Sequence, residues 1–114
     1  MTTRQVTTAT ATVAELRDVV AVAVERHPEA RSRIEAAASI VLLRSISPDP
    51  EYVACFTVES ESEPGRFYSV DHGVGVCDCA DHQRRGLRCK HLWSVRILAA
   101  LARLHGRQAV AVAA

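Results

Sequence analysis

The sequence predicts an α+β fold with two N-terminal helices, a small three-stranded antiparallel sheet and a C-terminal helix. Three observations predict this class. Apolar residues recur at helical spacing near both ends of the chain, and an alternating apolar pattern fills the middle. Paired cysteine and histidine residues lie between the alternating segment and the last helical segment. With 114 residues, 48% hydrophobic and 24% charged, the chain has the composition of one globular domain. That balance excludes wholesale disorder, and a second domain would have too little core of its own.

The first helix is predicted over residues 12–26. Thr12 and Glu15 have the spacing of a capping box, in which each side chain accepts a hydrogen bond from the other residue's backbone N–H. Helical spacing continues in the apolar residues that follow, Leu16, Val19, Val20, Ala23 and Val24. Because the residue before a proline disfavours helical geometry, Pro28 should end this helix. Residues 1–11 are small, polar and unpatterned and are predicted to be a disordered tail.

A second helix is predicted to begin at Pro28, since proline suits the first helical position. Its apolar face repeats at i, i+3, i+4 and i+7, in Ile34, Ala37, Ala38 and Val41. The apolar run Ile40–Leu43 overlaps the end of this pattern, and periodicity leaves open whether it ends the helix or forms a buried strand. Its β-branched residues and the turn signal of residues 47–50 favour a strand, which we predict.

Two further strands are predicted in the middle of the chain. Apolar residues alternate over Tyr52–Val58, as they do in a half-buried strand. A polar loop at residues 60–65 separates this run from a shorter strand at Phe67–Val70. With Ile40–Leu43, these segments give a sheet of three antiparallel strands, followed by a turn at residues 71–73.

The last helix is predicted from Lys90 or His91 to about Leu104. One face carries its large apolar residues, Trp93, Ile97, Ala100, Leu101 and Leu104. Gly106 is placed to end the helix, because glycine adopts the left-handed conformation common just after a helix. Residues 109–114 are predicted to be a short tail.

The four cysteines point to metal or thiol chemistry rather than to a disulfide framework. Residues 1–12 are rich in threonine and lack an apolar stretch, so we expect no secretory leader and a cytoplasmic protein with reduced thiols. A membrane-spanning segment is also excluded, because the longest apolar run, Ala36–Leu43, is far shorter than the roughly 20 residues that a span needs.

Three cysteines and one histidine have the spacing of a metal site. Cys77 and Cys79 are one residue apart, and Cys89 and His91 repeat that spacing after a loop that contains Gly86. Three thiolates and one imidazole are a complete tetrahedral ligand set for Zn²⁺. Because protein atoms fill every position, we expect one structural zinc ion rather than a catalytic one.

This pattern of Cys-x-Cys, a loop and Cys-x-His resembles the SWIM zinc finger, and the resemblance covers about residues 66–103. Phe67 and Tyr68 before the cysteines, Arg85 and Gly86 in the loop, and the apolar helix after His91 also match. One departure follows Cys79, where many members of the family have a proline. The resemblance implies zinc bound by the four residues in a β-β-α unit, and a role in binding nucleic acid or protein. Relatives form parts of remodelling ATPases, Mutator-like transposases and recombination accessory complexes, and this chain carries no ATPase motif.

The predicted organisation is therefore a single domain over residues 12–108. Residues 12–65 form its helices and first strands, and residues 66–104 form the zinc finger. His72 and His82 are alternative ligands, although their offsets from the cysteines are less regular than that of His91. Cys55 is predicted to be a buried strand thiol. The only tryptophan is expected to pack the last helix onto the sheet.

Charge is divided unevenly along the chain. Residues 1–81 hold all 13 acidic residues and seven basic ones, whereas residues 82–114 hold seven basic residues and no acid. A basic segment of this kind favours an anionic partner. The candidate nucleic-acid-binding residues are Arg84, Arg85, Arg88, Lys90, Arg96, Arg103 and Arg107. The alternative is a protein-interaction subunit of a larger remodelling or recombination ATPase assembly, whose acidic surface would meet the same residues.

An enzymatic function is not predicted. The sequence has no acid/base dyad, glycine-rich phosphate loop or nucleophile elbow, and a cysteine nucleophile would compete for the residues that zinc needs. We therefore expect no catalytic residue and no small-molecule substrate, and the sequence leaves the oligomeric state open.

Overall fold

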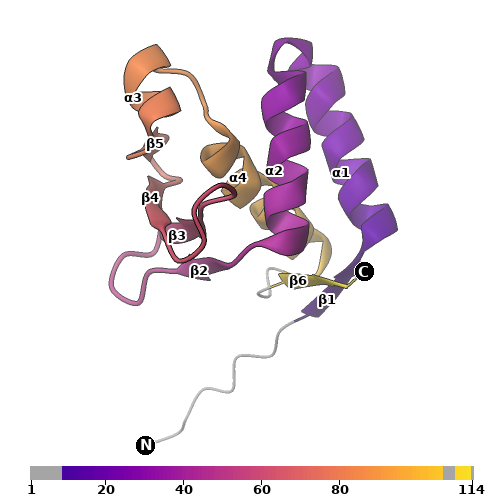
Figure 1. The fold of residues 1–114 in the computed structure, drawn as a ribbon. Coiled ribbons are helices and arrows are strands. Elements are labelled where there is room, and N and C mark those ends of the chain that lie inside the picture. The colour runs from indigo at the N-terminus through magenta and orange to yellow at the C-terminus, as the bar shows by residue number, and fades with distance from the viewer. Residues whose placement is uncertain (1–8, 107–109, 114) are drawn as a thin grey trace, which may run out of the picture.

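The computed structural model describes residues 9–106 and 110–113 (Figure 1). It is a mixed α+β fold in which three long helices stand beside a four-stranded antiparallel sheet. The elements are β1 (Ala9–Thr12), α1 (Val13–Arg26), the 3₁₀ turn η1 (Pro28–Ala30), α2 (Arg31–Leu43), β2 (Ile46–Pro48), β3 (Cys55–Glu59), β4 (Phe67–Asp71), β5 (Val76–Cys77), α3 (Ala80–Arg85), α4 (Lys90–Leu104) and β6 (Val110–Ala113). No helix in the described ranges has the length and apolar character needed to cross a membrane.

Helix α1 begins and ends where the sequence predicts. The capping box is formed: the Thr12 backbone N–H donates to Glu15 Oε1 at 3.0 Å, and the Glu15 N–H donates to Thr12 Oγ1 at 3.1 Å. At the other end the His27 N–H closes the last turn on the Ala23 carbonyl at 2.9 Å. Pro28 begins a 3₁₀ turn instead of the second helix, and α2 starts at Arg31.

The strand predicted at Ile40–Leu43 is wrong, because α2 continues through Leu43. The reason is that α2 lies between two cores. Ile40 packs with the sheet, while Val41 packs with the other helices, so apolar residues follow one another without an alternating pattern. The strand is displaced to β2, where Ile46 pairs with Val58.

The sheet has four strands in the order β2-β3-β4-β5, and the prediction of three strands is not confirmed. Its fourth strand is β5, which leads into the first motif cysteine and pairs Cys77 with Val70. Strand β3 is shorter than predicted and begins at Cys55. The preceding residues form a turn in which Asp49 Oδ1 accepts the Tyr52 N–H at 3.1 Å, leaving Val53 98% exposed.

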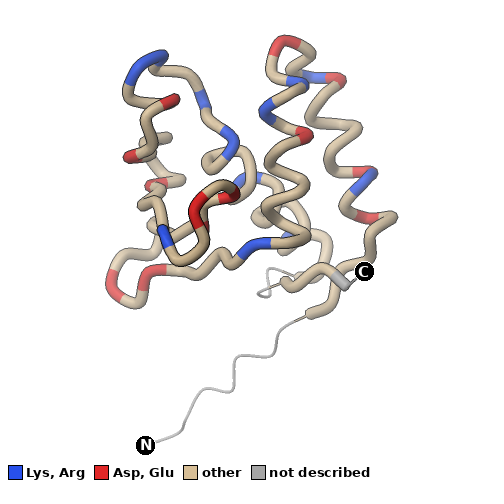
Figure 2. The backbone as a smooth tube through the Cα atoms, viewed as in Figure 1, with Lys and Arg blue, Asp and Glu red and all other residues tan. Residues whose placement is uncertain are grey.

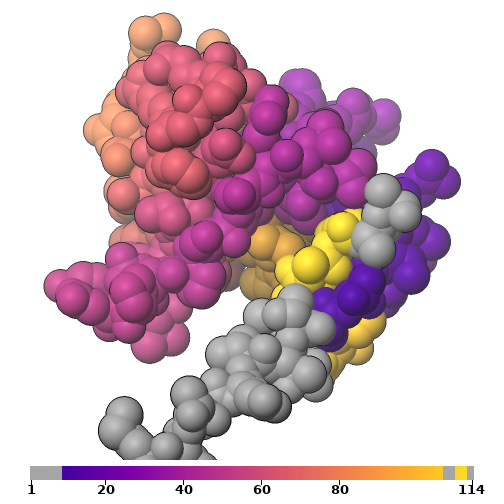
Figure 3. All heavy atoms as spheres, turned by 60° about the horizontal axis from the view of Figure 1, so that its bottom comes forward, coloured from indigo at the N-terminus to yellow at the C-terminus, as the bar shows by residue number. Residues whose placement is uncertain are grey.

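Residues predicted as tails form a second, two-stranded sheet. Strand β1 pairs with β6 in parallel, from Ala9 opposite Val110 to Thr12 opposite Ala113, and Ala11 is completely buried. In Figure 3 the two segments lie side by side, β1 in indigo and β6 in yellow. The partners are about a hundred residues apart, so no local pattern indicates the pairing. Of the residues predicted to be tails, residues 1–8, 109 and 114 lie outside the described ranges.

Two adjoining cores hold the fold together. The helical core joins α1, α2 and α4 and contains Ala11, Leu16, Ile34, Ala37, Val41, Trp93, Ile97 and Leu101. The sheet core joins the four-stranded sheet to α2 and α4 and contains Ile40, Val58, Val70, Cys77, Cys79, Cys89, Leu92 and Val95. Trp93 was expected against the sheet, but it belongs to the helical core, with its ring edge-on to His27 at 5.1 Å between centroids.

Candidate metal centre

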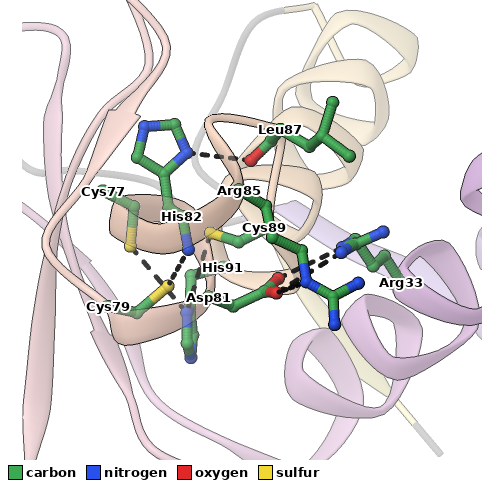
Figure 4. A network of polar contacts seen from close by, with 9 residues as sticks. All are labelled: Arg33, Cys77, Cys79, Asp81, His82, Arg85, Leu87, Cys89 and His91. Atoms are coloured by element: carbon green, nitrogen blue, oxygen red, sulfur yellow. Dashed lines mark hydrogen bonds and ion pairs between the residues drawn. The ribbon is translucent and has the colours of Figure 1, made fainter.

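The structure brings the four predicted metal ligands together. Cys77 ends β5, Cys79 is the N-cap of α3, Cys89 is the N-cap of α4, and His91 lies in the first turn of α4. All four side chains are buried, with at most 3% of each residue exposed, and their ligand atoms all lie within 4.8 Å of one another. Three separate elements therefore meet at one buried cluster that could hold a metal ion (Figure 4).

The distances fit a single ion of zinc size. His91 Nδ1 lies 3.8 Å from Cys77 Sγ and 3.8 Å from Cys89 Sγ. In a tetrahedral zinc site, bonds of about 2.3 Å to sulfur and 2.0 Å to nitrogen place these atoms about 3.5 Å apart. The Nδ1 atom of His91 is therefore the ring nitrogen that faces the sulfurs and would bind the metal ion. The ring of Tyr68 covers His91, with the two centroids 4.4 Å apart.

The three buried thiols differ in the direction in which their pKa values shift. The pKa of Cys89 is lowered to about 4, first by the hydrogen bond with Cys77. That same bond, followed by burial, raises the pKa of Cys77 above its ordinary value, and burial raises the pKa of Cys79. One thiolate is favoured and two thiols are held protonated. A metal ion would balance the three thiolates of a complete ligand set.

Helix α3, which the sequence analysis did not predict, shapes the loop between the ligand pairs. The His82 N–H donates to Cys79 Sγ at 3.5 Å, so the first turn of the helix is hydrogen-bonded to a ligand atom. Gly86 ends the helix with φ of 66°, a left-handed conformation that favours glycine, and its N–H donates to the His82 carbonyl at 2.8 Å. Gln83 Nε2 donates to the Cys77 carbonyl at 3.0 Å and ties the helix to β5.

The two alternative ligands have other positions. His82 Nδ1 lies 2.9 Å from the Leu87 carbonyl, and the contact spans the end of the loop (Figure 4). His72 lies in the turn between β4 and β5 and is not part of the cluster. Cys55 is half-buried at the start of β3, also outside the cluster, and burial raises its pKa.

An ion-pair network that the sequence did not predict joins the cluster to the helices. Arg33 on α2 donates to both carboxylate oxygens of Asp81, from Nε at 3.1 Å and from Nη2 at 3.3 Å. Arg85 Nε lies 3.4 Å from Asp81 Oδ1 on the same helix (Figure 4). The bond from Arg33 is the main reason that the pKa of Asp81 is lowered. Arg33 and Asp81 are 48 residues apart, and no local signal marks the pair.

The seven predicted nucleic-acid-binding residues differ in whether they have an acidic partner. Arg85 pairs with Asp81, and Lys90 Nζ lies 2.9 Å from Glu61 Oε1, so intramolecular acids neutralise both. Arg107 lies outside the described ranges. The remaining four have no acidic partner within 4.0 Å among the described residues: Arg84, Arg88, Arg96 and Arg103.

Three of those four arginines lie around one histidine. The pKa of His72 is lowered first by burial and then by the positive charges of Arg96, Arg103 and Arg88. Arg88 and Arg96 also cover the same indole, with their guanidinium carbons 4.8 Å and 5.5 Å from the centroid of the Trp93 ring. The result is a concentration of positive charge around His72 and Trp93.

Comparisons with protein-family models, with curated proteins and with solved structures find no match for this chain. A functional assignment therefore depends on the geometry and charge of the site.

Proposed function

We propose that this protein is a non-enzymatic binding module stabilised by one structural zinc ion, of the kind that the SWIM resemblance implies. The observation that carries the proposal is the buried set of Cys77, Cys79, Cys89 and His91. Three soft thiolates and one imidazole favour zinc, and a tetrahedral ion bound by all four has no position left for water or substrate.

The ion would act as a cross-link between short elements. The ligands come from the end of β5 and from the first residues of α3 and α4, and β5 and α3 have only two and six residues. Elements this short are not stable alone in water. The free energy of zinc binding in zinc-finger peptides is about 10–16 kcal/mol at neutral pH. An ion bound here would therefore hold the loop and its arginines in place.

We further propose that the partner is the phosphate backbone of a nucleic acid. The support is the uncompensated charge of Arg84, Arg88, Arg96 and Arg103, which lies on the end of α3, on the connection to α4 and along α4 (Figure 2). No acidic residue follows Asp81 in the sequence. Arginines without a carboxylate partner remain free to release counterions from a phosphate chain.

Fluorescence anisotropy with labelled duplex and single-stranded DNA tests this role. The zinc-loaded protein is expected to bind at physiological salt, and the Arg88→Gln and Arg96→Gln variants should each weaken binding and reduce the slope of log K against log salt by about 0.9 on duplex DNA. Arg17→Gln is the matched control, because Arg17 is exposed on α1 away from these arginines. No binding below about 100 μM, or equal effects of all three variants, would contradict the nucleic-acid role.

The protein-interaction role implied by the resemblance is the competing function. It would leave the zinc site unchanged and give no binding to DNA. Loss of zinc with a retained hydrolase activity would instead contradict both binding roles, because an enzyme would then have to use the same thiols.

A further inference from the structure

A groove runs between α1 and α4 on the helical side of the molecule. Its volume is about 330 Å³, within the range of ligand-binding clefts. The apolar part of its lining comes from both helices: Val19, Val22 and Ala23 on α1, and Trp93, Ile97, Ala100 and Leu104 on α4.

The apolar surface extends out of the groove to solvent. Val22 is 45% exposed and Leu104 is 61% exposed, and they lie on opposite sides of the seam between the two helices. Exposed aliphatic side chains on both edges of an apolar groove are typical of a surface that binds another molecule. A groove between two helices is a shape that can accept a third helix.

The rim of the groove is positively charged. Arg26, Arg96 and Arg103 line it, against a single acid, Asp18. None of these arginines has an acidic partner within 4.0 Å among residues 9–106 and 110–113. Complementary charge sets the register and the encounter rate of a bound partner, so this rim favours an anionic one.

We propose that the groove docks an acidic amphipathic α-helix of another protein. Apolar side chains at i, i+4 and i+7 of that helix contact the accessible apolar lining at Val22, Ala100 and Leu104, and acidic residues flanking them face the arginines of the rim. This interaction surface goes beyond the proposed nucleic-acid role, and because Arg96 and Arg103 belong to both surfaces, the two partners would compete for them. The apolar lining gives a phosphate chain nothing to contact, which distinguishes the two partners.

The occupant is not a segment of this chain. Residues 1–8, 107–109 and 114 contain no aspartate or glutamate, so these segments cannot supply an acidic helix. The chain's own long helices do not fit either: α1 has three acidic residues against two arginines, α2 has one acid against two arginines, and α4 has no acid. A second copy of the chain therefore lacks the acidic helix that the rim requires.

The test uses the zinc-loaded protein and a fluorescein-labelled helical peptide of about 18 residues with leucines at i, i+4 and i+7 and glutamates around them. The same peptide with lysines in place of the glutamates is the charge control. Saturable binding of the acidic peptide alone is expected. Val22→Glu should weaken it about tenfold or more, because the variant places an acid on the apolar edge of the groove. Ala21→Glu adds the same charge to an exposed neighbour outside the groove and should change the affinity by less than about twofold.

Several results would overturn the proposal. These are no binding up to about 1 mM peptide, equal binding of the lysine peptide, or equal effects of Val22→Glu and Ala21→Glu. Self-association that Val22→Glu abolishes, measured by sedimentation, would assign the groove to a second copy of the chain instead. Arg84→Gln separates the two proposals, since it should weaken DNA binding and leave peptide binding unchanged: Arg84 does not line the groove. Each variant is first checked for one bound zinc and an unchanged circular dichroism spectrum.

Discussion

The two cores of this protein differ in the kinds of side chain that they contain. The helical core is aliphatic and aromatic, and all of its side chains except that of Ala11 on β1 come from helices of 13 to 15 residues. In the sheet core, three of the eight buried residues are cysteines, and two of the elements that supply them are very short. One core can be held by apolar burial alone, whereas the other includes three thiols whose geometry suits a metal ion.

This comparison shows how a chain of 114 residues can support an irregular loop of charged residues. The helical core acts as a scaffold, and Arg33 on α2 contacts the loop through Asp81. A metal ion held by Cys77, Cys79, Cys89 and His91 would fix the end of β5 and the starts of α3 and α4 relative to that scaffold. The stability of the two regions should therefore respond to different perturbations.

The largest expected effect follows removal of the metal. Chelation should remove amide-exchange protection from β5, α3 and the first turn of α4, because metal binding is worth about 10–16 kcal/mol in comparable sites. Helices α1 and α2 should keep their protection, since apolar contacts hold them. Hydrogen exchange followed by mass spectrometry, before and after chelation, measures both regions in one sample. Unchanged exchange over residues 77–104 would contradict the account.

Loss of one ligand should be the next largest effect. Cys89→Ser leaves three of the four donors and should lower metal affinity sharply, with loss of zinc during dialysis against a weak chelator. Cys55→Ser is the matched control, because Cys55 lies outside the cluster. The control should retain one zinc ion per chain, measured by atomic emission. Equal zinc content in the two variants would remove Cys89 from the site.

A cavity in the helical core should lower stability without affecting the metal. Leu101 is completely buried, so Leu101→Ala should lower the free energy of unfolding by about 2–5 kcal/mol in urea. Leu104→Ala, at a position 61% exposed, should cost less than about 0.5 kcal/mol. Both variants should keep one zinc ion. If Leu101→Ala releases the metal as well, the two cores are not independent.

The ion pair that joins the two regions should contribute a smaller amount. Arg33→Gln removes the double contact with Asp81, and both partners are partly exposed, so the expected loss is about 0.2–1 kcal/mol. Arg31→Gln is a control on the same helix, where the pair with Glu35 at 3.9 Å is more exposed. Urea melts at low and high salt would show whether the cost of Arg33→Gln exceeds that of the control. Equal costs would mean that Asp81 does not couple the regions.

The smallest effect concerns the acid dependence of the helical region. Folding lowers the pKa of Glu15, first through the hydrogen bond from the Thr12 N–H and also through the charge of His105. The carboxylate therefore stabilises the fold above its unfolded pKa, and this contribution disappears as the pH falls through the lower, folded value. Glu15→Gln should flatten that part of the stability profile below pH 4.5, the ordinary value for the group. An unchanged acid limb of the thermal melt would contradict this.

The sequence predicts what is encoded locally. The capping box of Thr12 and Glu15 and the paired spacing of the cluster residues each depend on neighbours within a few positions, and the structure forms both. Apolar periodicity does not identify the end of α2, because this helix packs on two cores and both Ile40 and Val41 are buried. The bounds of α4 match because Gly106, with φ of 71°, follows its last turn, even though α4 also contributes side chains to both cores.

Contacts between residues far apart in the chain could not be predicted from the sequence. The parallel pairing of β1 with β6 joins segments of small residues with no amphipathic signal. The contact of Arg33 with Asp81 and the separation of the predicted arginines into paired and unpaired groups depend on tertiary placement. A count of charges along the sequence cannot distinguish Lys90, which pairs with Glu61, from Arg88, which covers Trp93.

Native mass spectrometry of the reduced protein tests the central claim most directly. We predict the mass of one chain plus one zinc ion, with the displaced thiol protons missing, and loss of that ion after chelation. Cys55→Ser should give the same stoichiometry. A metal-free chain with all thiols protonated would contradict the metal centre. A metal-free mass that is two or four protons short would indicate disulfides. The oxidised cysteines would then not be available to bind zinc.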